Sequence, residues 1–179
     1  FEGEVFYNVY FTVSDATSVV DLGLITFDSA VSNGTIDNAE NCFIGAVYDE
    51  TKGYYMVQTD GIAAKNLGDD IYMCVYAKTE NGIVYSNVTK YSPKQYALSR
   101  LENSKNENMK ALCVALLNYG AAAQTYFGYN TDALMNATLT AEQQALVVAY
   151  NASYFKGAVA ADSTKAAAFV STNSGFSSK

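Results

Sequence analysis

The side chains that could do chemistry in this 179-residue chain are carboxylates, lysines, tyrosines and three cysteines, because histidine is absent. Without an imidazole, a serine–histidine triad, a cysteine–histidine dyad and a histidine-ligated zinc site are all excluded. Two carboxylates could still act as a glycosidase pair, roughly 5–10 Å apart in a cleft. The acids, however, fall in stretches typical of turns, such as Asp49-Glu50 and Asp69-Asp70. We therefore expect solvated turn residues and no enzyme activity.

Two polar segments place several oxygen-bearing side chains close together in the sequence. Asp28, Asp37 and Glu40 share one segment, and Asn130 and Asp132 share another. Neither segment has the ligand spacing of a known calcium loop, and the chain has no glycine motif that cradles phosphate. We expect no metal and no cofactor, with structural calcium as the alternative.

Aromatic side chains are the best binding candidates, since the chain has 15 tyrosines and 9 phenylalanines but no tryptophan. In the strand-like segment DIYMCVYAK, Tyr72 and Tyr76 alternate with the apolar positions. If the apolar set forms the core, these tyrosines face outward and could stack on sugar rings or fill a protein interface, with Tyr54 as a third candidate. The alternative, which we favour, is that they are buried beneath the helices that follow.

The net charge of −7 limits the partners that the chain can have. Residues 1–92 carry 13 acids and 4 bases, and residues 93–179 carry 5 acids and 7 bases. An acidic surface repels phosphate backbones and anionic lipid, so we expect neither nucleic-acid nor membrane binding. No apolar run is long enough to span a bilayer, which predicts no membrane insertion.

The three cysteines, Cys42, Cys74 and Cys113, are far apart and form no CxxC motif. Cys74 and Cys113 lie in apolar surroundings, where a thiol usually behaves as a small buried hydrophobe. An odd count argues against a closed disulfide framework, although one pair could still form a bridge.

Residues 1–92 have the patterning of a β-structure. The segment VFYNVYFTV alternates with a period of two, so Tyr7, Val9 and Phe11 share one face. Residues 50–53 are rich in turn formers and predict a hairpin, and Asn81-Gly82 predicts another with a type I′ turn. Several short strands separated by such turns indicate an immunoglobulin-like antiparallel β-sandwich.

The period changes at Ser92-Pro93, where an N-cap and a first-turn proline predict a helix that ends near Asn103. A second, long helix should follow and end at Gly128, with an apolar stripe made of Met109, Leu112, Leu116, Tyr119 and Ala123. A third helix is predicted from Thr140, which with Gln143 fits a capping box.

The predicted fold class is therefore α+β, a β-sandwich followed by a packed helical hairpin. We expect residues 93–155 to pack on residues 1–92 as one unit, because an amphipathic hairpin needs an apolar surface to cover. Residues 156–179 are small and polar, and we expect a linker or the start of a next module there.

Three segments carry a resemblance to a known family: GIAAKNLGDDIY, KYSPKQYALSRL and ALLNYGAAAQTYFGYNTDALMNATL. They resemble a module of large secreted or wall-attached proteins of gut clostridia and ruminococci, in which a β part precedes a helical pair. The match is dense over residues 61–139 and weak over residues 14–52. The resemblance implies an extracellular or cell-surface setting, and no functional residue is carried over from it.

These observations predict a monomeric, non-catalytic interaction or spacer module of a bacterial surface adhesin-type protein. Both ends of the chain resemble boundaries within a longer polypeptide. The expected partners are a host protein or glycan, or neighbouring modules of the same polypeptide. A carbohydrate-binding module that uses surface tyrosines is the alternative, and the lack of tryptophan counts against it.

Overall fold

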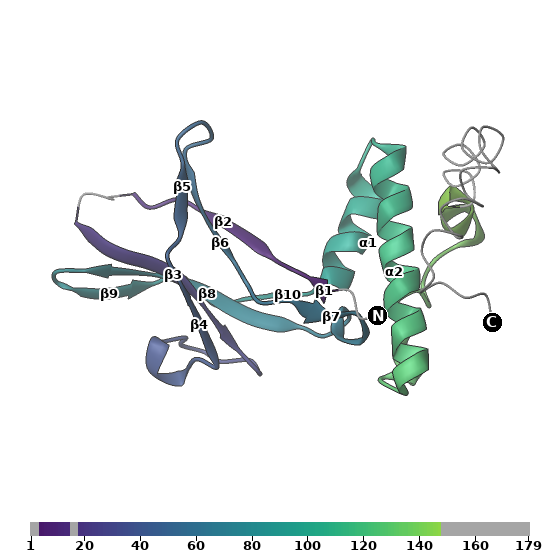
Figure 1. The fold of residues 1–179 in the computed structure, drawn as a ribbon, viewed down its shortest axis with the longest axis horizontal. Coiled ribbons are helices and arrows are strands. Elements are labelled where there is room, and N and C mark those ends of the chain that lie inside the picture. Colours follow the sequence, from purple (N-terminus) through teal and green to yellow (C-terminus); the bar gives the residue numbers. More distant parts are fainter. Residues whose placement is uncertain (1–3, 15–17, 148–179) are drawn as a thin grey trace, which may run out of the picture.

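The computed structural model describes residues 4–14 and 18–147 of the chain. Antiparallel strands form the first part, and helices stand together at one end of them (Figure 1). The mixed α+β class predicted from the sequence is therefore confirmed. The predictions for residues 148–155 and for residues 156–179 lie outside the described residues.

The larger sheet is built around two nine-residue strands, β3 (Val19–Phe27) and β8 (Ile71–Thr79). The strand order is β10-β8-β3-β4, with β4 spanning Asn41–Ile44. Two short strands, β9 (Gly82–Tyr85) and β10 (Thr89–Tyr91), pair with the two ends of β8. Because β3 pairs along nearly all of β8 on one edge, β9 and β10 occupy its other edge.

A second sheet has the order β2-β6-β5, with β2 at Asn8–Phe11, β6 at Tyr54–Gln58 and β5 at Val47–Asp49. The predicted hairpin at residues 50–53 is confirmed as the β5–β6 turn. The chain passes from β4 in the first sheet to β5 in the second at Gly45, whose φ of 79° is readily available to glycine. A single apolar run in the sequence is thus divided between two sheets.

One apolar cluster joins the two sheets. Leu24 of β3, Val57 of β6 and Met73 of β8 are its buried members. The alternation predicted for the first strand is confirmed, because Tyr7, Val9 and Phe11 pack against this cluster, whereas Phe6 and Tyr10 on the opposite face are about half exposed. Burying each large apolar side chain contributes roughly 1.5–3 kcal/mol.

The β8–β9 hairpin is present, but the predicted turn type is wrong. Thr79 pairs with Gly82, so the two-residue loop is Glu80-Asn81 and not Asn81-Gly82. A type I′ turn needs positive φ at both loop residues, and neither residue has it. The Thr79 hydroxyl accepts from the Asn81 N–H (3.2 Å) and donates to the Gly82 carbonyl (3.0 Å), which holds the turn in another form.

The two long helices have the predicted ends. Helix α1 spans Pro93–Asn103. Its N-cap is Ser92, whose hydroxyl accepts from the Gln95 N–H at 3.2 Å. Helix α2 spans Glu107–Phe127 and ends at Gly128, which takes the left-handed φ of 63°. A further helical stretch covers residues 141–147, where Thr140 and Gln143 make both bonds of the predicted capping box.

The predicted apolar stripe of α2 is partly right, because Ala123 is buried and Met109 and Leu116 pack against the helical core, but two of its members are misplaced. Leu112 is 62 % exposed and Tyr119 is 41 % exposed, whereas Cys113, Leu117 and Ala121 are buried. The buried face is lined mainly by small side chains because neighbouring segments approach the helix closely there. At Gly120, an added Cβ would overlap the Met135 sulfur.

The helices pack on the end of the β part and not on the face of β8 that carries Tyr72 and Tyr76. Their core cluster includes Leu67 and reaches β1 (Glu4–Val5) and β7 (Ile62–Ala63), which form a small two-stranded sheet. Leu67 directly follows the short 3₁₀ helix η2 (Ala64–Asn66). The expectation that the helices cover the tyrosines is therefore corrected, since the nearest apolar surface is at this end of the molecule.

The NYGAAAQTYFGYN phrase is explained by packing and hydrogen bonding. The Asn118 amide donates to the Gln144 side chain (2.9 Å), and the buried Gln124 side chain accepts from the Met135 N–H (2.9 Å). The Tyr129 hydroxyl donates to Asp69 at 2.7 Å, which links the end of α2 to the turn before β8. These polar residues of the phrase therefore connect α2 to other segments.

We expect the substitution Gly120→Ala to destabilise the chain by about 1–3 kcal/mol, although alanine favours a helix by about 1 kcal/mol. The reason is the overlap of the new methyl group with the buried Met135 side chain. Urea unfolding followed by circular dichroism measures the change. In a Met135→Ala background the same substitution should be neutral or stabilising. An equal cost in both backgrounds would contradict the packing explanation.

Candidate interaction site

The structure separates the three tyrosines predicted to bind a ligand. Tyr76 is buried, with 3 % of its surface exposed, and Tyr72 is half-buried beside it in the same cluster. Tyr54 is half-buried on β6, in the other sheet. Tyr76 therefore offers no exposed ring for stacking, and the three residues form no common surface.

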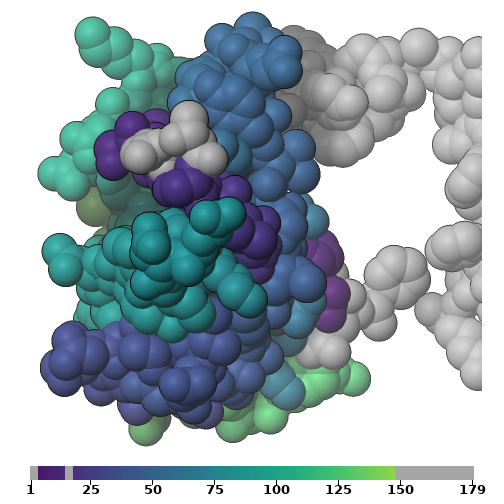
Figure 2. Space-filling view, turned by 90° about the vertical axis from the view of Figure 1, so that its left-hand side faces the viewer, coloured from purple at the N-terminus to yellow at the C-terminus, as the bar shows by residue number. Residues whose placement is uncertain are grey.

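Both faces of β8 are covered, and this explains the burial of Tyr76. Ile71, Met73 and Val75 face the second sheet, whereas Tyr72 and Tyr76 face a cluster closed by the segment between β3 and β4. Val31, Ile36 and Ala39 of that segment pack on the cluster. Figure 2 shows the end of the molecule away from the helices, with the teal β8–β9 hairpin in the centre and this dark-blue segment below it.

A polar interaction fixes the Tyr76 ring inside this cluster. Its hydroxyl donates to Asp21 at 3.0 Å, and the Cys42 thiol lies 3.8 Å from the same oxygen. Gly23 makes room for the ring, since a Cβ there would lie 2.6 Å from it. Burial, followed by the bond to Asp21, raises the pKa of Tyr76. Neutral Tyr76 is thus a structural residue.

The three cysteines are free thiols in the structure, as Cys42 is exposed and Cys74 and Cys113 are buried. The prediction that Cys74 and Cys113 behave as small buried hydrophobes is confirmed. Burial raises the pKa of both thiols, which keeps them protonated and poorly nucleophilic.

Five acidic side chains line one cavity of about 460 Å³ near the turn that precedes β8. Asp69 there accepts from Tyr129 and from Asn66, and Asp70 forms an ion pair with Lys90 at 2.9 Å. A hydrogen bond with Asp28 raises the pKa of Glu40. Among residues 4–14 and 18–147, no three such side chains are arranged to hold a metal ion. The carboxylates that line the cavity are Asp28, Glu40, Asp60, Asp69 and Asp70.

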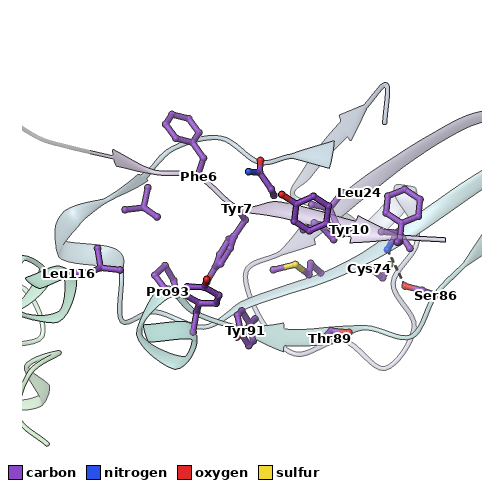
Figure 3. Close-up of a pocket in the computed structure, with 17 residues that line it drawn as sticks. Phe6, Tyr7, Tyr10, Leu24, Cys74, Ser86, Thr89, Tyr91, Pro93 and Leu116 are labelled. Atoms are coloured by element: carbon purple, nitrogen blue, oxygen red, sulfur yellow. Dashed lines mark hydrogen bonds between the residues drawn. The ribbon is translucent and has the colours of Figure 1, made fainter. Parts of the chain in front are cut away.

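The strongest candidate site is an uncharged cleft of about 580 Å³ between the two sheets. One wall is β2, and the other is the edge of the first sheet that carries Ser86, Thr89 and Tyr91 (Figure 3). The floor contains Leu24, Met73 and Val75 of the inter-sheet core. Pro93 and Tyr96 of α1 and Leu116 of α2 close the end of the cleft nearest the helices. We call this feature the β2–β10 cleft.

Three exposed aromatic residues lie along the rim of the β2–β10 cleft, with Phe6 and Tyr10 on the solvent side of the strand that forms one wall. Phe6 is 49 % exposed, Tyr10 54 % and Tyr96 37 %, and all three line it. Tyrosine and phenylalanine are enriched where proteins bind one another, because a large rigid ring gives contact area at low entropic cost. The volume lies within the range of about 300–1,000 Å³ that is usual for ligand sites.

Tyr7 supplies an unsatisfied polar atom to the cleft. Its side chain runs from β2 toward Pro93 and Tyr91 (Figure 3), and its ring centroid lies 6.2 Å from that of Tyr91. The hydroxyl oxygen is buried and has no hydrogen-bond partner. Burial raises the pKa of Tyr7, so its neutral hydroxyl is a donor available to a ligand.

The outer face of the second sheet forms a separate aromatic surface. Tyr10 and Tyr54 meet edge to face with ring centroids 4.9 Å apart, and the Lys52 ammonium lies 5.5 Å from the centroid of Tyr54. On the same face, the Gln58 amide donates to Asn8 at 3.0 Å. Tyr54, one of the predicted ligand residues, belongs to this surface and not to the β2–β10 cleft.

Sequence reasoning missed the β2–β10 cleft. It identified the inward and outward faces of the first strand, which supply Tyr7 and Tyr10, but not the unpaired edge of that strand. No signal in the sequence marked this edge as unpaired, because strand order is set by contacts between distant segments.

No family model matches the chain, and no curated protein and no solved structure matches it either. The resemblance to secreted clostridial modules stays a prediction. Within residues 4–14 and 18–147, no helix has both the length and the apolar character needed to cross a membrane.

The environment of Tyr76 predicts a loss of stability in alkali. A raised pKa in the folded chain means that the stabilisation is present below the unfolded-state pKa of about 10 and is lost as pH rises toward the folded-state pKa. Above pH 10 each such tyrosine should lower the free energy of unfolding by about 1.4 kcal/mol per pH unit. Tyr76→Phe should reduce this slope by the contribution of one titrating proton, as measured by urea unfolding at pH values between 9 and 11.5.

The control for this experiment is Tyr126→Phe, because Tyr126 is 83 % exposed. It makes the same chemical change on an exposed ring that is remote from the Tyr76–Asp21 hydrogen bond. A Tyr76→Phe slope equal to that of the parent chain would show that Tyr76 ionises as easily in the folded state as in the unfolded one.

Proposed function

We propose that this chain is a non-catalytic interaction module that binds a protein partner in the β2–β10 cleft. The observation that carries the proposal is the combination of an uncharged apolar floor with a rim of exposed aromatic rings. Interfaces obtain most of their binding energy from a few desolvated aromatic anchors, and this rim supplies them. A host protein or a sister module of a surface adhesin-type polypeptide is the expected partner.

The strand orders support an immunoglobulin-like sandwich as the scaffold of this module. The order β5-β6-β2 corresponds to strands D, E and B of that fold, and β4-β3-β8 followed by β9 and β10 corresponds to C′, C, F and G. The cluster of Leu24, Val57 and Met73 then corresponds to the inter-sheet core. We further propose that residues 1–92 and 93–155 act as one unit.

A non-catalytic role agrees with how the acidic residues are used. Asp69 is held by Tyr129 and Asn66, and Asp70 by Lys90, so both serve the turn before β8. The chain has no histidine that could work with them. The acidic balance disfavours nucleic acid, and the resemblance to secreted modules favours an extracellular or cell-surface setting.

Carbohydrate binding is the second candidate, and the outer face of β2-β6-β5 favours it. Tyr10 and Tyr54 lie together there beside the amides of Asn8 and Gln58, a combination of ring and amide groups that suits a sugar. The interplanar angle of 69° allows only one of the two rings to lie flat against a given sugar. This surface replaces the one first predicted with Tyr72 and Tyr76.

The protein-binding proposal predicts that Thr89→Arg reduces partner binding at least about tenfold, or about 1.4 kcal/mol. Thr89 is exposed, lines the cleft and pairs with Met73, so a long cation there occupies the uncharged floor. Proteins captured from host secretions on the immobilised chain are identified by mass spectrometry and then measured singly by biolayer interferometry.

Ser99→Arg is the matched control, because Ser99 is exposed on α1 outside the cleft and the charge change is the same. A partner that binds both variants equally would refute the assignment to the β2–β10 cleft. A partner whose binding is lost on enzymatic deglycosylation would support the carbohydrate alternative instead.

The carbohydrate alternative predicts that Tyr54→Ala abolishes any binding on a glycan array, since Tyr54 is the central ring of the outer face. Tyr126→Ala, on an exposed ring of α2, should leave such binding intact. Array binding that survives Tyr54→Ala would place the sugar elsewhere.

A further inference from the structure

The edge of β2 that faces the cleft is unpaired. The N–H and C=O groups of Tyr7 point to the opposite edge of β2, the one next to β6. There the Tyr7 C=O accepts from the Thr59 N–H (3.0 Å), and the Tyr7 N–H donates to the Thr59 hydroxyl (3.1 Å). Successive residues of a strand direct these groups to opposite edges. Asn8 and Tyr10 therefore direct their N–H and C=O groups to the open edge, with which no strand of the described residues pairs.

The strand order identifies what belongs at this edge. An immunoglobulin-like sandwich has the order A-B-E-D in one sheet, so strand A lies next to strand B. Here β2, β6 and β5 fill the positions of B, E and D, and the β2–β10 cleft lies where strand A would be. Core residues Leu24, Met73 and Val75 reach the cleft because this position is open in the described chain.

The charge of the cleft limits the chemistry of its occupant. None of its lining residues is ionisable as an acid or a base at neutral pH, although the chain carries a net charge of −7. A charged side chain that entered would be desolvated without a partner, which is unfavourable. An uncharged strand with apolar residues at alternate positions fits, since one face covers the core and the other faces solvent.

We propose that the β2–β10 cleft binds an extended, uncharged peptide segment of a partner protein, which pairs with the open edge of β2 and takes the place of strand A. This proposal rests on the proposed interaction function and specifies its mode as strand addition, in which backbone hydrogen bonds supply affinity and alternate side chains supply specificity. A backbone carbonyl of the bound segment is a suitable acceptor for the unsatisfied Tyr7 hydroxyl.

The test uses the full chain and a synthetic decapeptide of alternating valine and threonine, acetylated and amidated so that it carries no charge. Binding is followed by the shifts of backbone amide signals in nuclear magnetic resonance spectra. The Asn8 and Tyr10 amides should move and should become protected from hydrogen exchange when the peptide binds.

The decisive variants are Asn8→Pro and Asn8→Ala. Both remove the exposed Asn8 side chain, but only proline removes the N–H at the open edge, and proline is tolerated at the edge of a sheet. Asn8→Pro should weaken peptide binding at least about tenfold relative to Asn8→Ala, whereas thermal melting should confirm that both variants are folded.

Other results overturn the proposal. Equal affinity for the two variants, no shift of the Asn8 and Tyr10 amides, or a shift of those amides by cellohexaose but not by the peptide would each exclude strand addition. The wider function is judged separately by Thr89→Arg. A captured partner that is lost with Thr89→Arg but retained with Asn8→Pro would preserve the interaction module and refute only the mode proposed for it.

Discussion

The burial of β8 on both faces is the constraint on which the rest of the β part depends. Met73 faces the second sheet, and Tyr76 faces the segment between β3 and β4. Two covering layers are therefore needed, and each comes from a different part of the chain. Among the described residues the second sheet has three strands, so it covers the centre of the first sheet and leaves its own β2 edge open. The cleft is a consequence of this unequal coverage.

Local patterns allowed the strands and helix ends to be predicted because their signals lie within a few residues. The period-two alternation placed Tyr7, Val9 and Phe11 on one face, and Ser92-Pro93 marked the start of α1. Features set by distant contacts were not predictable in this way. The buried face of α2 depends on Met135, which approaches Gly120 from a segment beyond the helix. Leu112 and Tyr119 were therefore wrongly assigned to the buried face.

The candidate site shows the same division between local and distant information. Tyr72 and Tyr76 were correctly placed on one face of a strand, but which layer covers that face is a tertiary property. An edge that lacks a partner leaves no mark on the residues of the strand itself. Tyr10 has the same alternation in either case, and only the strand order shows that its backbone groups face a cleft.

The carboxylates near the turn before β8 have a consequence for the junction between strands and helices. Five of them line one cavity, and one of the five, Asp69, holds the end of α2 through Tyr129. Like charges at close range raise the energy of the folded junction, and dissolved ions screen that repulsion over about 8–10 Å. The same ions also screen the Asp70–Lys90 ion pair, so we expect the junction to respond to ionic strength, whereas the uncharged β2–β10 cleft should not.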